Sequence, residues 1–188
     1  MKGWTVLFLL IAAGLNAQDR GLYIDLGTAF GIQRVGTSDL KAKPGFMLGV
    51  EYWSTGSKGN SWSASAAWNS FSQGDKHKKE TYEYVTLRVL PLIWNLGKKQ
   101  LWYAEFGFFG NYLLLQQFKD GGAVLKQTEL SQRPYAGLSA GVGARLGQPG
   151  ENRLLIGLRN DFGLLGFGSG KPLQFSTLTL FAGLDIIH

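Results

Sequence analysis

The sequence predicts an all-β protein: an eight-stranded antiparallel up-and-down transmembrane β-barrel, preceded by a cleaved signal peptide. Between residues 22 and 32, every second side chain is large and apolar or a threonine, whereas most intervening positions carry glycine, alanine or a polar group. Strand side chains point alternately to opposite faces, so this segment has one apolar and one small or polar face. The pattern recurs to the C-terminus, and its second face carries few charges for a water-exposed surface. Such strands are typical of barrels with a lipid-facing exterior and a polar lumen.

The composition favours many short strands over a bundle of membrane helices. The chain has 188 residues, which suits one domain, with 45% hydrophobic residues, 27 glycines and a mean hydropathy of −0.03. The absence of cysteine excludes a disulfide framework, a thiol nucleophile and a lipidated N-terminal cysteine. The net charge is +6, which for an exported chain favours anionic headgroups over nucleic acid. We therefore expect outer-membrane lipid and lipopolysaccharide as partners, and no nucleic acid.

Residues 1–17 have the three parts of a signal peptide. Lys2 supplies the positive charge, residues 6–13 supply the apolar segment, and Leu15-Asn16-Ala17 resembles a small-residue cleavage site. The apolar segment is too short to cross a bilayer as a helix. We expect residues 1–17 to be removed and residues 18–188 to form the outer-membrane barrel domain.

Eight segments show the alternating pattern, and the predicted strands are 21–33, 44–55, 61–72, 81–94, 100–115, 133–147, 152–163 and 173–187. In the first four, typical outward side chains are Leu22, Ile24 and Leu26; Phe46, Leu48 and Val50; Trp62, Ala64 and Ala66; and Val85, Leu87 and Val89. In the last four they are Ala104, Phe106 and Phe108; Leu138, Ala140 and Val142; Leu154, Ile156 and Leu158; and Leu178, Leu180 and Ala182. Each strand thus offers one continuous apolar stripe to lipid.

The connections alternate in length, which predicts the orientation of the barrel. The second, fourth and sixth connections (56–60, 95–99 and 148–151) are short and rich in turn-forming residues, whereas the others are longer and more polar. Bacterial barrels have short periplasmic turns and longer outer loops. We therefore expect an outer-membrane protein with both termini in the periplasm.

Four tryptophans flank the predicted periplasmic turns. Trp53 and Trp62 lie beside one turn, and Trp94 and Trp102 lie beside the next. Tryptophan is enriched at membrane–water interfaces, where one end of the ring is apolar and the other hydrated. We expect these four to form an aromatic girdle; the alternative is that they are ordinary core residues.

The predicted lumen carries eight charged residues: Asp25, Glu51, Arg88, Glu105, Arg145, Arg159, Asp161 and Asp185. An eight-stranded barrel is only just wide enough to be filled by its own side chains, and charges buried there must pair. We expect a salt-bridge network that plugs the barrel, in which two arginines, Arg145 and Arg159, share the carboxylates of Glu105, Asp161 and Asp185. The alternative is a proton or ion path.

The third connection carries a basic cluster, Lys76, His77, Lys78 and Lys79, which is a candidate contact for lipopolysaccharide. The other interpretation is a loop solvated by its charges. A catalytic triad would need His77 oriented by a carboxylate such as Asp75 and facing Ser70 or Ser72, and nothing in the sequence fixes that arrangement. The chain has two distant histidines and no cysteine, so we predict no metal site and no cofactor.

Three segments resemble strands of PorT-like outer-membrane β-barrel proteins. Residues 101–112, with Glu105, Gly107, Gly110 and Tyr112, resemble their mid-barrel strand; 138–145 resemble the glycine-alternating strand, and 158–164 the penultimate one. The resemblance implies an outer-membrane barrel without catalytic residues, and some relatives are linked to protein secretion. Many such barrels end with an aromatic residue, whereas this chain ends with Ile187-His188.

The function expected from the sequence is that of a small closed outer-membrane barrel without catalysis. Its role would be structural, adhesive or in envelope assembly, including secretion, with an envelope protein as a further partner. Two alternatives stay open: an outer-membrane enzyme that modifies lipid A, and a secreted soluble barrel that binds a ligand.

Overall fold

The computed structural model describes residues 17–33, 42–56, 60–74, 78–96, 101–121, 123–126, 134–147, 152–166 and 175–187. In these ranges the strands are β1 (Ala17–Gln33), β2 (Ala42–Gly56), β3 (Ser61–Gly74), β4 (Lys78–Leu96), β5 (Trp102–Asp120), β6 (Ala123–Lys126), β7 (Tyr135–Leu146), β8 (Leu154–Gly166) and β9 (Phe175–Ile187). None of these residues belongs to a helix long and apolar enough to cross a membrane.

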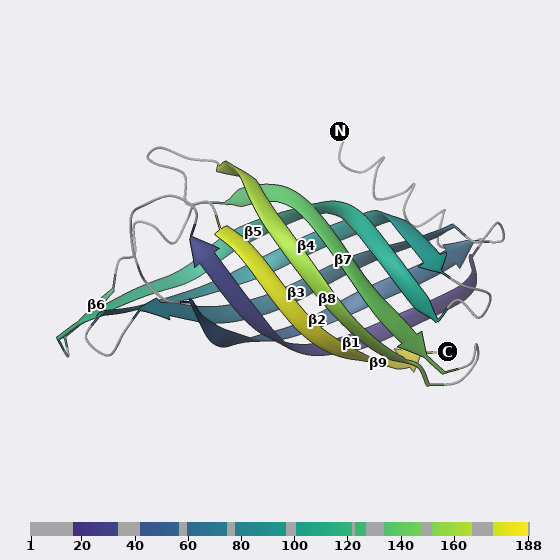
Figure 1. Ribbon diagram of the computed structural model, residues 1–188, viewed down its shortest axis with the longest axis horizontal. Coiled ribbons are helices and arrows are strands. Elements are labelled where there is room, and N and C mark those ends of the chain that lie inside the picture. Colours follow the sequence, from purple (N-terminus) through teal and green to yellow (C-terminus); the bar gives the residue numbers. More distant parts are fainter. Residues whose placement is uncertain are drawn as a thin grey trace.

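Eight of the strands form a closed antiparallel barrel, as predicted (Figure 1). Each of these eight strands pairs with the next one along the ring, with β5 pairing directly with β7, and β1 pairs with β9 to complete the ring. The short strand β6 pairs only with the end of β5, so it adds to the wall without belonging to the ring. The structure therefore has the fold class expected from the alternation alone.

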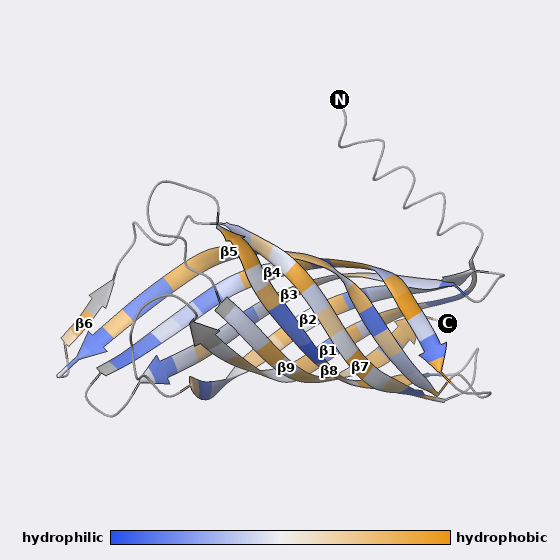
Figure 2. Ribbon diagram, turned by 45° about the horizontal axis from the view of Figure 1, so that its top comes forward, coloured by the Kyte–Doolittle hydropathy of each residue, from blue (hydrophilic) through white to orange (hydrophobic). Residues whose placement is uncertain are grey.

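Side chains alternate between the two faces of the wall in the predicted phase. Leu26, Leu87 and Val142 are exposed on the outside, whereas Asp25 and Arg88 are buried in the interior. Figure 2 shows the corresponding bands of hydrophobic and hydrophilic residues along the strands. A one-residue shift would move every side chain to the other face, so the agreement confirms the assigned register.

One bulge changes the phase of β4. Leu90 is buried, Pro91 and Leu92 are both exposed, and Ile93 is buried again. The pairing of β4 with β5 shifts at the same place, between Val89 and Leu92. Proline has no N–H to donate to a neighbouring strand, so it is tolerated where the ladder is interrupted. The bulge returns Trp94 to the outer surface.

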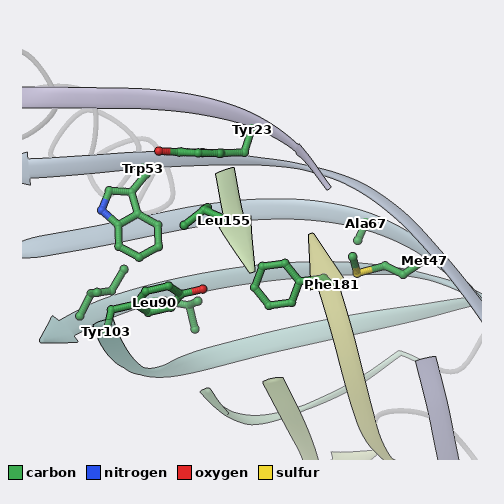
Figure 3. Close-up of a cluster of buried hydrophobic side chains, with 9 residues drawn as sticks. Tyr23, Met47, Trp53, Ala67, Leu90, Tyr103, Leu155 and Phe181 are labelled. Carbon is green, nitrogen blue, oxygen red and sulfur yellow. The ribbon is translucent and has the colours of Figure 1, made fainter. Parts of the chain in front are cut away.

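The interior holds two clusters of buried apolar side chains. The first is Tyr23, Met47, Trp53, Ala67, Leu90, Ile93, Tyr103, Leu155 and Phe181, in which the rings of Trp53 and Tyr103 meet edge to face at 5.0 Å (Figure 3). The second is Phe71, Tyr82, Tyr84, Phe109, Leu113 and Tyr135. In β4 and β5, Arg88 and Glu105 lie between a member of one cluster and a member of the other. Apolar layers thus enclose the charged middle of the barrel.

Glycines in the wall make room for the interior rings. A Cβ atom on Gly143 would lie 2.4 Å from the Tyr103 hydroxyl oxygen, and one on Gly157 would lie 2.5 Å from the Phe181 ring. These two glycines are direct partners on β7 and β8. The glycine-rich face therefore complements bulky side chains from other strands, and the barrel is filled.

Beyond the barrel, the ends of β3, β4 and β5 continue together with β6. We call residues 72–74, 78–81, 117–120 and 123–126 the projecting sheet (Figure 1). The prediction of a long third connection is wrong, because β3 extends to Gly74 and β4 already begins at Lys78. The polar side chains on these strand ends resemble a loop in composition, although their backbone groups are paired in the sheet.

A charge on the outer face of β7 should destabilise the barrel in a bilayer. Val142→Arg places a cation against lipid, and we expect it to lower the free energy of unfolding by about 2–4 kcal/mol. Unfolding by denaturant in lipid vesicles measures this change, with Val142→Leu as the control. Equal stability of the two variants would show that this face does not meet lipid.

A substitution at Gly141, next to Val142, should also destabilise the barrel, but for a different reason. Gly141 faces the interior, where an added Cβ would lie 2.4 Å from a carboxylate oxygen of Glu105. We therefore expect Gly141→Ala to lower the unfolding temperature in detergent and in lipid alike, because the clash lies inside the wall. The matched variant Gly110→Ala, at a position with open space around it, should be neutral.

Candidate functional site

The centre of the lumen contains one arginine shared by two glutamates. Arg159 of β8 contacts Glu105 of β5 through Nε at 2.5 Å and Nη2 at 3.0 Å, and its Nη2 also donates to Glu51 of β2 at 3.1 Å. All three side chains are buried, and the guanidinium lies 4.7 Å above the Phe181 ring. This arrangement links three strands across the interior with charge-assisted hydrogen bonds.

A second pair spans the lumen from β4 to β8. Arg88 Nη2 lies 2.6 Å from Asp161 Oδ2, and Arg88 Nε also donates to this carboxylate. Both side chains are buried. Two nitrogens of the planar guanidinium donate hydrogen bonds to one planar carboxylate, so each charge is neutralised by its partner.

A third cluster closes the end of the barrel near the start of β1. Arg153, just before β8, contacts both oxygens of Asp19 at 2.6 and 2.7 Å and lies 3.4 Å from Asp185 of β9. Arg145 of β7 lies 3.5 Å from Asp19 and 5.6 Å from the Trp53 ring. The cluster ties the first strand to the last, across the seam where the ring closes.

All eight charged residues expected in the lumen are buried there, but their pairing differs from the expected one. Arg159 does bind Glu105. Arg145, however, pairs with Asp19 instead of sharing the same carboxylates, because it lies on β7 near the end of the barrel. Asp161 and Asp185 likewise pair with arginines other than Arg145 and Arg159.

Two members of the network, Asp19 and Arg153, were missed by sequence reasoning. Each precedes the interior residues of its strand by an even number of positions, as Asp19 precedes Tyr23 and Arg153 precedes Leu155. The alternating phase could therefore have placed both of them inside. Asp19 was overlooked because it lies two residues before the expected strand 21–33, and Arg153 because it is only the second residue of the expected strand 152–163.

The predicted aromatic girdle is wrong for one of its four tryptophans. Trp53 is buried inside the barrel at 1% exposure, whereas Trp94 and Trp102 are exposed on the outside. Trp62 is half-buried on the outer face, where it packs against Tyr52. Trp53 follows Glu51 by two residues on β2, so both side chains point into the barrel, although Trp53 lies near a turn.

The basic cluster lies partly outside the described residues. Lys76 and His77 are not among them, and the prediction of a loop is wrong for Lys78 and Lys79, which are in β4. Lys79 is exposed and lies directly opposite the exposed Lys119 of β5. Like charges in opposite positions of a sheet repel, so this pair offers a site of positive potential on the projecting sheet.

The described residues contain no group of histidine, cysteine or acidic side chains that could hold a metal ion. Of the residues that a catalytic triad would need, Asp75 and His77 lie outside those residues. The Ser72 hydroxyl lies 3.1 Å from that of Thr81 in the neighbouring strand. Its observed role is therefore a cross-strand hydrogen bond.

The fold is similar to that of two solved structures. Ail, the attachment invasion locus protein of Yersinia pestis, matches with a TM-score of 0.51 at 14% identity, over 89% of this chain and 99% of that one. Neisserial surface protein A (NspA) matches with a TM-score of 0.54 at 11% identity, over 90% of this chain and 97% of that one. No family model and no curated protein matches the sequence. At these identities the likeness concerns the fold, and the PorT-like family is not shown.

Removing the shared arginine should destabilise the barrel. Arg159→Met leaves Glu51 and Glu105 buried without their cation, and we expect a loss of about 3–5 kcal/mol in the free energy of unfolding. Denaturant titration of the folded barrel measures it, and the exposed Arg20→Met serves as a near-neutral control. An Arg159→Met variant as stable as the control would show that the network contributes nothing to the fold.

Proposed function

We propose that this chain is a small closed outer-membrane barrel without catalysis, whose role is structural, adhesive or in envelope assembly. The observation that supports this most is the exterior: each of the eight barrel strands carries exposed large apolar side chains. Soluble proteins rarely expose apolar surface on this scale. The filled interior leaves this surface as the place where apolar material can be bound.

The orientation follows from the expected signal peptide and the position of the projecting sheet. β1 begins and β9 ends at the end of the barrel opposite β6 (Figure 1). We propose that this end faces the periplasm, so the projecting sheet extends outside the cell. The apolar belt then crosses the outer membrane, and Trp94 and Trp102 lie at its periplasmic interface.

Of these roles, the projecting sheet at the outer end of the barrel supports an adhesive one best. Lys79 and Lys119 form an exposed positive pair there, and Lys76 and Lys78 are close in sequence. Phosphate groups of lipopolysaccharide have the complementary charge. The shared fold with a protein named for attachment and invasion agrees with this role, and secretion-linked assembly, as in PorT-like barrels, is the second form.

The other two alternatives receive less support. A soluble ligand-binding barrel needs a polar exterior and an interior cavity, whereas the apolar side chains are outside and the rings and charges fill the inside. No observation in the described residues favours an enzyme that modifies lipid A.

The purified protein should insert into membranes without forming a channel. We expect it to stay with the outer-membrane fraction of cells and to need detergent for extraction. In planar bilayers we expect no steady conductance, because eight strands leave no open water path when side chains fill the interior. Extraction in plain buffer would contradict the membrane assignment, and a stable single-channel current would contradict the closed lumen.

Charge reversal on the projecting sheet should weaken binding to lipopolysaccharide. We expect Lys79→Glu combined with Lys119→Glu to reduce binding to lipopolysaccharide-coated surfaces, most strongly at low salt, because the attraction is screened within about 10 Å at 0.1 M salt. As a control matched in charge, the single change Lys119→Glu is compared with Arg20→Glu at the opposite end of the barrel. An equal effect of both changes would show that net charge, and not this sheet, carries the binding.

A further inference from the structure

One acidic side chain of the lumen lacks the partner that its neighbours have. Asp25 of β1 is 3% exposed, and its Oδ1 has no hydrogen-bond partner within the described parts of the chain. It also makes no ion pair with the described residues, whereas Glu51, Glu105, Asp161 and Asp185 each lie within 4.0 Å of an arginine.

The wall around Asp25 leaves it no local donor. Its direct partners are Gly49 on β2 and Gly183 on β9, neither of which has a side chain to offer. A Cβ on Gly183 would lie 2.1 Å from Asp25 Oδ1, so the carboxyl group lies folded against this glycine. The sequence thus provides a close-fitting space for the group but no charge to neutralise it.

The charges around Asp25 are unfavourable to another anion. The charged groups that act on it are Glu51 from β2, Glu105 from β5, Arg88 from β4 and Arg159 from β8. The buried Tyr103 hydroxyl of β5 also interacts with it. Arg88 is already bound to Asp161, and Arg159 is shared by both glutamates. The desolvation free energy of a buried carboxylate without a counter-charge exceeds the net stability of a fold of this size. The charge must therefore be removed or compensated by something bound.

A proton fits this position better than a metal ion. The described residues hold no cluster of acidic side chains arranged for a metal, although three carboxylates belong to this part of the lumen. Protonation removes the charge without any further ligand, and an Asp–COOH gains one O–H donor for its surroundings.

We propose that Asp25 is a proton-binding site, and that the folded barrel carries this proton at neutral pH. The barrel then takes up a proton as it folds, since aspartate in an unfolded chain is ionised above about pH 4. Its stability falls as the pH rises, because the unfolded state binds fewer protons than the folded state. The proposal depends on the filled interior and not on the adhesive role.

Infrared spectroscopy of the folded protein in lipid vesicles tests the proposal directly. At neutral pH we expect the carbonyl band of a protonated carboxylic acid, shifted when the protein is labelled with ¹³C-aspartate. This band should be absent from Asp25→Asn and unchanged in Asp120→Asn, whose side chain is exposed on the projecting sheet. A wild-type spectrum without the band, or a band that persists in Asp25→Asn, would overturn the proposal.

Unfolding at several pH values provides the second measurement. For the wild type we expect the folding equilibrium constant to fall about tenfold per pH unit between about pH 5 and about pH 7, and Asp25→Asn should lose this dependence. Asp25→Asn should fold at least as well as the wild type at neutral pH, since an amide replaces a neutral acid. A variant that fails to fold, or one that keeps the wild-type slope, would contradict a neutral Asp25.

Discussion

The limited width of an eight-stranded ring determines most of this structure. Such a barrel has room only for its own side chains, so each large interior residue must be matched by a small one on another strand. Gly143 and Gly157 provide the space for Tyr103 and Phe181, and the charged side chains around Arg88 and Glu105 occupy the layer between the two apolar clusters. Because the interior is full, function has to be sought on the outer surface, in the projecting sheet and in the chemistry of the buried charges.

The buried charges are distributed so that each group links strands that are distant in the sequence. Arg159 joins β8 to β5 and β2, Arg88 joins β4 to β8, and Arg153 joins the start of β8 to both β1 and β9. Buried ion pairs of this kind contribute little net stability, but a strand register that left one of the charges unpaired would cost several kcal/mol. They therefore favour one register of the ring. Asp25 differs from these residues because it makes no ion pair with the described residues, and this difference is the basis for the proposed proton-binding site.

The fold was predictable because the two-residue alternation, which can be read from any short segment, determines which face of the barrel wall each side chain occupies. The alternation from Leu22 to Ile186 predicted the strands and the face of most of their residues, including the interior position of Trp53, although the nearness of Trp53 to a turn suggested a girdle. It did not predict the bulge at Pro91. The pairing of charges was not predictable, since it depends on how far each strand is shifted against residues across the lumen. Arg145 was assigned to Glu105, Asp161 and Asp185 for this reason, whereas it meets Asp19. The ends of β3 and β4 were missed because polar strand ends have the composition of loops.

The wall of the barrel separates lipid outside from a sealed interior. Fluorescence of single-tryptophan variants in lipid vesicles tests it most directly, with either Trp102 or Trp53 retained and the other tryptophans replaced by phenylalanine. Brominated lipid should quench Trp102 strongly, and Trp53 should be shielded from both brominated lipid and aqueous acrylamide. Quenching of Trp53 by acrylamide as strong as that of free tryptophan, or no quenching of Trp102 by lipid, would contradict the account.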